Sequence, residues 1–116
     1  MQSMNTESLA SLFKALSEPV RLRILNLFLS KKGEICVCDL VDTLGLSQSV
    51  ISRHLAYLRH NNILTARREG VWMYYQFTTY AKTDLVPLFD FMRQTIAECE
   101  VMQADLENYQ KNNCCA

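Results

Sequence analysis

Two cysteines separated by a single residue, Cys36 and Cys38, have the most distinctive chemistry in this 116-residue chain. Thiolates are soft ligands that select soft, thiophilic ions, so such a close pair is a candidate chelating site. The pair lies at the start of a predicted helix, where unpaired N–H groups and the positive end of the helix dipole favour the thiolate form. The alternative is that both cysteines are small buried hydrophobic residues.

The spacing of the two cysteines constrains the backbone around them. Residues i and i+2 of an α-helix point about 200° apart, so Cys36 and Cys38 cannot both face one ion if both are helical. Binding requires a helix start that is non-helical or that unwinds. Distortion here would displace the segment that follows, which makes the pair a candidate switch.

The segment after the cysteines has the pattern of a DNA-binding motif. A short helix from about Cys38 to Leu44 is predicted to stop at Gly45, and Ser47 is predicted to cap a longer helix that ends near His60. A helix, a short turn with glycine and a helix with a polar front end form the helix-turn-helix pattern. The longer helix has an apolar stripe that we expect to face the core: Ile51, Leu55 and Leu58.

The polar front of the longer helix supplies the candidate DNA-binding residues: Ser47, Gln48, Ser49, Ser52, Arg53 and His54. Gln48 suits adenine, Arg53 suits guanine or phosphate, and the serines suit either a base or a phosphate. The alternative is an ordinary solvated helix face with Ser47 as a plain cap. His54 has two interpretations, a contact to phosphate or packing at the edge of the core.

A β-hairpin is predicted after this helix. Residues 63–68 and 71–77 flank a turn at Glu69 and Gly70, and the second segment is rich in aromatic and β-branched residues. Arg67 and Arg68 lie near the tip, where we expect them to bind phosphate or the minor groove as a wing does. They could equally be ordinary solvated hairpin residues.

Three further helices are predicted, over residues 6–16, 19–30 and 84–109. The last has an apolar stripe longer than a small core can bury, so we expect it to form a dimer seam with a second chain. The predicted fold is mainly α with a β-hairpin, a winged helix-turn-helix of about five helices with a two-stranded wing. Residues 1–110 form the domain, and 111–116 form a flexible cysteine-containing tail. The apolar stripe of the last predicted helix, over residues 84–109, comprises Leu85, Leu88, Met92, Ile96, Cys99, Met102, Leu106 and Tyr109.

Composition narrows the class of protein. The chain has five cysteines, an odd number, and its N-terminus lacks a signal-peptide pattern. Both features indicate a cytoplasmic protein whose cysteines serve metal or redox chemistry rather than a disulfide framework. No apolar run approaches the length of a membrane span, and no phosphate loop, Cys/His pair or carboxylate pair indicates an enzyme. Net charge is zero, but residues 47–70 hold four arginines against one glutamate, a basic patch that attracts phosphate.

The order of these elements resembles the ArsR/SmtB family of winged-helix metalloregulators over nearly the full chain. The resemblance is clearest in three segments: residues 34–40, 47–55 and 67–72. The first of these, residues 34–40, is similar to the arsenical-resistance repressors in particular. It implies a homodimer that binds double-stranded operator DNA when metal-free. It also implies release on binding As(III) or Sb(III) at Cys36 and Cys38, with no obligatory cofactor.

One position departs from the best-known arsenic repressors, in which a third cysteine directly follows the Cys-Val-Cys-Asp-Leu segment. Here that position is Val41. The third sulfur could come from Cys99, Cys114, Cys115, a partner chain or an exogenous thiol.

Three other functions stay open. A Cd(II)- or Pb(II)-responsive repressor has the same fold, but the related cadmium sensors use a cysteine near the N-terminus, and none precedes Cys36. A thiol redox switch would use Cys36 and Cys38, or Cys114 and Cys115. A metal-buffering protein would not bind DNA. The last helix contains no histidine, so the zinc site of Asp, His and Glu known in some family members is not expected.

Overall fold

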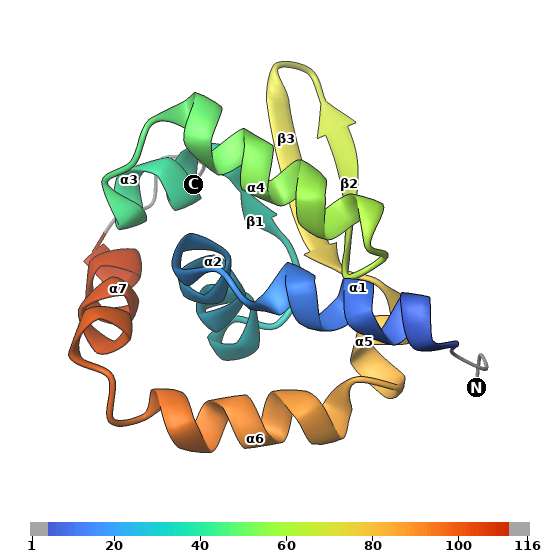
Figure 1. The fold of residues 1–116 in the computed structure, drawn as a ribbon. Helices are drawn as coiled ribbons and strands as arrows, with labels where there is room; N and C mark the ends of the chain where they lie inside the picture. Colours follow the sequence, from blue (N-terminus) through green and yellow to red (C-terminus); the bar gives the residue numbers. More distant parts are fainter. Residues whose placement is uncertain (1–4, 112–116) are drawn as a thin grey trace.

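The computed structural model describes residues 5–111, in which seven helices combine with a three-stranded antiparallel sheet (Figure 1). The helices are α1 (Thr6–Leu16), α2 (Pro19–Ser30), α3 (Val37–Leu44), α4 (Gln48–His60), α5 (Thr79–Thr83), α6 (Val86–Ile96) and α7 (Glu100–Lys111). The strands are β1 (Ile35–Cys36), β2 (Leu64–Glu69) and β3 (Trp72–Phe77). The winged helix-turn-helix architecture is confirmed, with more helices than the five predicted.

The first two helices begin and end where the sequence predicts. The side chain of Asn5 caps α1 by accepting a hydrogen bond from the backbone N–H of Ser8 at 2.8 Å. Pro19 occupies the first turn of α2, where its missing N–H costs no helical hydrogen bond. Helix α2 is the central buried helix, and Ile24, Leu25 and Leu27 have no exposed surface.

The helix-turn-helix is formed by α3 and α4. Gly45 ends α3 in the left-handed conformation, at φ 68°, which is why glycine suits this position. Ser47 then caps α4 through a 3.3 Å hydrogen bond from the backbone N–H of Val50 to its hydroxyl. The predicted core stripe of α4 is confirmed, since all three of its residues are fully buried: Ile51, Leu55 and Leu58.

The wing contains a third strand that the sequence did not predict. Strand β3 is central, with β2 on one side and β1 on the other. In the pairing of β1 with β3, Ile35 is opposite Tyr75 and Cys36 is opposite Tyr74. A two-residue strand has no alternating pattern of its own, so only its partner defines it. The prediction of a two-stranded wing is therefore wrong, and the segment before α3 is part of the sheet.

The predicted last helix is divided into two, α6 and α7, and an additional short helix precedes them. Residues 79–83 form α5, and Pro87 lies in the first turn of α6, which starts two residues after the predicted start at 84. A break over residues 97–99 separates α6 from α7 and turns α7 back toward α2 and α3 (Figure 1). The prediction of one continuous helix over residues 84–109 is therefore wrong, and part of its apolar stripe packs within the same chain: Ile96, Met102, Leu106 and Tyr109.

Polar contacts explain why α7 folds back. The guanidinium of Arg23 donates two hydrogen bonds, at 2.8 and 2.9 Å, to the buried carboxylate of Asp105. The side-chain amide of Asn26 donates to the backbone carbonyl of Met102 at 3.0 Å. These groups come from distant parts of the chain, so the break has no local sequence signal. Among residues 5–111, no helix has the length and apolar character that crossing a bilayer requires.

Candidate metal centre and nucleic-acid interface

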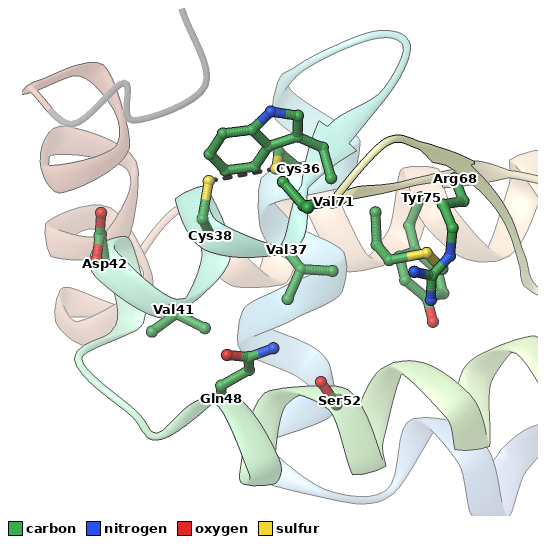
Figure 2. A pocket seen from close by; sticks show the side chains of 12 residues that line it. Cys36, Val37, Cys38, Val41, Asp42, Gln48, Ser52, Arg68, Val71 and Tyr75 are labelled. Atoms are coloured by element: carbon green, nitrogen blue, oxygen red, sulfur yellow. Dashed lines mark hydrogen bonds between the residues drawn. The ribbon is translucent and has the colours of Figure 1, made fainter.

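The two sulfur atoms of Cys36 and Cys38 lie 3.2 Å apart (Figure 2). Cys36 is the N-cap of α3, with φ −75° and ψ 142°, so its backbone is extended. Cys38 is the second residue of the helix. The helix therefore begins after Cys36, which is the first of the two predicted alternatives. The sulfurs meet without any unwinding of α3.

The cysteine pair opens onto a cavity of about 470 Å³ between α3, the start of α4 and the wing (Figure 2). Cys36 itself is buried, and Cys38 is half-buried. The cavity joins the thiols to residues predicted to read DNA. Its lining includes Val41 and Asp42 from α3, Gln48 and Ser52 from α4, and Arg68, Trp72 and Tyr75 from the sheet.

A third ligand for this pair is not provided by the described part of the chain. Within residues 5–111, no group of three or more His, Cys, Asp or Glu side chains could hold a metal ion. Cys99 is half-buried and lies between α6 and α7. Cys114 and Cys115 lie outside the described residues.

Four of the predicted DNA-binding residues on α4 have exposed side chains: Gln48, Ser49, Ser52 and Arg53. Ser47 is also exposed, but its hydroxyl caps the helix and lies 3.2 Å from the hydroxyl of Ser49. The polar front of α4 is therefore available to a ligand, whereas its apolar stripe holds it against the core.

His54 lies on the core side of α4 and is only 9% exposed. Its Nδ1 is 3.2 Å from an Nη of Arg21 and 3.8 Å from a carboxylate oxygen of Glu18. Desolvation lowers the pKa of His54; Glu18 opposes that shift, and the charges of Arg21 and Arg53 add to it. The burial favours the second interpretation of His54, packing at the edge of the core.

Arg21 was missed by sequence reasoning. Its guanidinium donates to the backbone carbonyls of Ala15 and Lys14, at 2.7 and 3.1 Å, and lies 4.2 Å from the ring centroid of Tyr57. Arg21 lies on α2 and joins the end of α1 to α4. The only sequence feature that could have indicated this role is a charged residue on an otherwise apolar helix.

The two wing arginines are in different environments. Arg67 donates to the carboxylates of Glu34 and Glu69, and its guanidinium lies 4.6 Å from the ring centroid of Tyr74. These carboxylates raise the pKa of Arg67, and the hydrogen bond from Arg67 lowers the pKa of Glu34. Arg68 instead lines the cavity beside the cysteine pair. Arg67 therefore joins the wing to the segment that leads into Cys36.

Comparisons with known proteins define the family. The family model for the bacterial regulatory proteins of the arsR family matches residues 18–66. The arsenical resistance operon repressor of Escherichia coli (strain K12) is 40% identical over 103 residues, which cover 89% of this chain and 86% of that protein. The chain belongs to the ArsR family. The expectation of a transcriptional regulator rather than an enzyme is thereby confirmed.

One further sequence relative and two solved structures are similar to this chain. A cadmium resistance regulatory protein CadC homolog of Staphylococcus aureus is 37% identical over 75 residues, 65% of this chain and 61% of that protein. HlyU from Vibrio cholerae matches with a TM-score of 0.70 and 28% identity, over 84% of this chain and 100% of that chain. The homodimeric winged helix-turn-helix domain Mb0332 from Mycobacterium bovis matches with a TM-score of 0.65 and 28% identity, over 84% and 92%.

Burial of His54 predicts a pH-dependent stability. A base whose pKa is lowered in the folded state binds fewer protons there, so stability is lost as pH falls through the unfolded pKa, near 6.5. We expect the unfolding temperature of the native protein to fall between about pH 7 and pH 5 more steeply than that of His54→Gln. His60→Gln, at an exposed position of the same helix, is the matched control and keeps the native slope. Equal slopes for the native protein and His54→Gln would contradict the assignment.

Proposed function

We propose that this ArsR-family protein is a cytoplasmic repressor that binds operator DNA as a homodimer and releases it on binding As(III) or Sb(III) at Cys36 and Cys38. The observation that supports this most is the 3.2 Å separation of the two sulfurs at the junction of β1 and α3. The similarity to an arsenical resistance operon repressor supports the same class of inducer.

The sulfur separation favours a pyramidal ion. Thiolates bind zinc at about 2.3 Å, and at a similar bond length a separation of 3.2 Å gives an S–ion–S angle of roughly 90°. This angle is narrower than the tetrahedral angle of structural zinc sites. It suits trivalent arsenic or antimony, whose preferred site is a three-sulfur pyramid.

The position of the pair connects inducer binding to DNA binding. Cys36 is held by the sheet through the pairing of β1 with β3, whereas Cys38 belongs to the first helix of the helix-turn-helix. An ion bonded to both sulfurs therefore joins the wing to α3. Its binding changes the cavity that both cysteines share with Gln48, Ser52 and Arg68. We infer that the wing and α4 then no longer fit the duplex together.

The DNA-binding role rests on the exposed front of α4 and on Arg68. We propose that Gln48, Ser49, Ser52 and Arg53 enter the major groove and that Arg68 contacts phosphate. Ser47 contributes as a cap that holds the start of α4 in position. Arg67 and His54 contribute to DNA binding through the contacts that position the wing and α4.

The first prediction concerns the cysteine pair. Cys36→Ser and Cys38→Ser are expected to leave operator affinity unchanged and to abolish release by arsenite, because the hydroxyl that replaces each thiol is not a soft ligand. The measurement is fluorescence anisotropy of labelled operator titrated with arsenite, antimonite, cadmium, lead and zinc. Cys99→Ser is the matched control and responds as the native protein does. Normal release from both variants of the pair would contradict this site, and release by cadmium alone would indicate a cadmium sensor.

The second prediction concerns the reading helix. Arg53→Ala is expected to weaken operator binding by about 1–3 kcal/mol and to reduce its salt dependence, because one guanidinium contact to DNA is lost. Arg93→Ala, at an exposed arginine of α6, is the matched control and binds normally. The measurement is the operator dissociation constant over a series of salt concentrations. Native affinity in Arg53→Ala would count against α4 as the reader.

The homodimer is supported by large apolar side chains exposed on α1 and α6. Leu9 and Phe13 of α1 are 43% and 53% exposed, and Val86 and Phe91 of α6 are 40% and 64% exposed. Exposed apolar faces of this kind indicate protein–protein contact. The structural relative from Mycobacterium bovis, a homodimeric domain, supports the same arrangement.

The third prediction tests this interface. Phe91→Glu is expected to shift the protein toward a monomer and to weaken operator binding, because a charge in an apolar interface is costly to desolvate. Val71→Glu is the control for the oligomeric state alone, since Val71 is 85% exposed at the turn of the wing rather than on α1 or α6. Sedimentation velocity measures the oligomeric state. A Phe91→Glu variant that stays dimeric would exclude this face.

A further inference from the structure

The cavity beside the cysteine pair has an arginine on its opposite side. Cys36 and Cys38 line the cavity where α3 begins, and Arg68 lines it from β2 of the wing. We propose that the cavity binds As(III) together with one low-molecular-weight thiol that carries a carboxylate. The two cysteines hold the arsenic, and Arg68 holds the carboxylate. This inference rests on the proposed function and names the form in which the inducer is bound.

The pairing of the strands sets the distance between the two ends of the site. Cys36 is opposite Tyr74 of β3, and Arg68 is opposite Met73, the neighbouring residue of the same strand. Adjacent strands lie about 4.8 Å apart, so the Cα atoms of Cys36 and Arg68 are separated by about 10 Å across β3. One small ligand can therefore reach both ends.

Arg68 is available to an anion, unlike its neighbour Arg67. Arg67 donates hydrogen bonds to the carboxylates of Glu34 and Glu69. Among residues 5–111, no carboxylate lies within ion-pair distance of Arg68, and its side chain is exposed. A guanidinium is always charged and can donate two parallel hydrogen bonds to one carboxylate. Arg68 thus has the chemistry of a carboxylate-binding group within the cavity.

The charges of the other lining residues orient such a ligand. Asp42 lines the cavity from α3, one helical turn after Cys38, and Figure 2 shows it on the cysteine side, away from Arg68. A negative group on the ligand is therefore repelled at the cysteine end and attracted at the Arg68 end. Gln48 and Ser52 line the cavity from α4 and provide neutral hydrogen-bond donors.

The third bond of arsenic explains why the ligand includes a thiol. The cysteine pair supplies two sulfurs, and residues 5–111 contain no group of three side chains that could hold a metal ion. Cys38 is half-buried at the edge of the cavity, so a thiol from solution can reach an arsenic atom bound there. Two CH₂ groups between a thiol and a carboxylate span about 5 Å at ordinary bond lengths. The arginine side chain covers the rest of the distance.

The reaction that forms the complex is a ligand exchange. Arsenous acid, As(OH)₃, reacts with the two cysteine thiols and the external thiol, so that three As–O bonds break, three As–S bonds form and three water molecules leave. Each thiol gives its proton to a departing hydroxyl group. Neither arsenic nor sulfur is oxidised or reduced.

The same arginine connects the ligand to release of DNA. Arg68 is the wing residue that we propose contacts phosphate, and the carboxylate of a bound thiol uses the same N–H donors. One guanidinium cannot hold both anions in this way at the same time. The carboxylate of the ligand and the phosphate of the operator therefore compete for Arg68.

The first test measures arsenite binding without DNA. Trp72 is the only tryptophan of the chain and lines the cavity, so its fluorescence reports binding. Arsenite is titrated with 3-mercaptopropionate or with its neutral isostere 3-mercaptopropionamide, into the native protein and Arg68→Gln. We expect the preference for the acid, the ratio of the two apparent Kd values, to be roughly fivefold larger in the native protein, the effect of one exposed ion pair. Arg59→Gln, exposed on α4 and outside the cavity, is the matched control and keeps the native ratio.

X-ray absorption of the same complexes counts the sulfurs bound to arsenic. We expect three with either thiol present and two without added thiol. Three sulfurs in the absence of added thiol would show that the chain itself supplies the third. Equal preferences in the native protein and Arg68→Gln would show that Arg68 does not hold the carboxylate. Either result would overturn the inference and leave the proposed function intact, whereas failure of arsenite to bind with either thiol would contradict the proposed function.

The second test measures release of labelled operator from the native protein. We expect the arsenite concentration for half release to be roughly fivefold lower with 3-mercaptopropionate than with 3-mercaptopropionamide, and neither thiol alone to release the operator. Equal half-release concentrations, despite tighter binding of arsenite with the acid, would overturn the competition at Arg68.

Discussion

The pairing of β1 with β3 is the interaction on which the site depends. It holds Ile35 and Cys36 in an extended conformation, so that α3 begins only after Cys36. Without that constraint a Cys-x-Cys segment could continue as helix, and the two thiols would then point in nearly opposite directions. The two-residue strand thus brings the two sulfurs together despite an unfavourable spacing, with one sulfur on the sheet and the other on the helix-turn-helix, and this is the pair that we propose binds the inducer.

The location of the cavity connects this pair to the rest of the molecule. It is bounded by α3, by the polar start of α4 and by the wing, so the proposed inducer site and the proposed DNA-binding surface share residues. A local change in sulfur geometry therefore does not have to travel through the core to reach the duplex. The core itself, with Leu55 and Leu58 of α4 fully buried, acts as the rigid support against which α3 and the wing are positioned.

The arginines illustrate how one residue type is used in two ways. Arg21, Arg23 and Arg67 are bonded within the chain, where they join α1 to α4, α2 to α7, and the wing to the segment before Cys36. Arg53 and Arg68 are exposed on the elements that we propose meet DNA. A net charge of zero is thus compatible with DNA binding, because what matters is which charges remain on the binding surface.

Elements whose signals are local could be predicted from the sequence. These are the first two helices, the end of α3 at Gly45, the core stripe of α4 and a hairpin around Gly70. The polar residues on the exposed front of α4 followed from the same periodicity, and the cysteine pair from residue type alone. In each case hydrogen bonds or apolar spacing within a few residues specify the structure.

Features that depend on distant partners could not be predicted from the sequence, because they form only when the chain folds. Strand β1 exists because β3 is beside it, and the break before α7 exists because Arg23 and Asn26 hold Asp105 and Met102. Burial of His54 and the ion pair between Arg67 and Glu34 likewise join segments more than thirty residues apart. Their stabilising energy comes from contacts across the fold, and no window of sequence contains both partners.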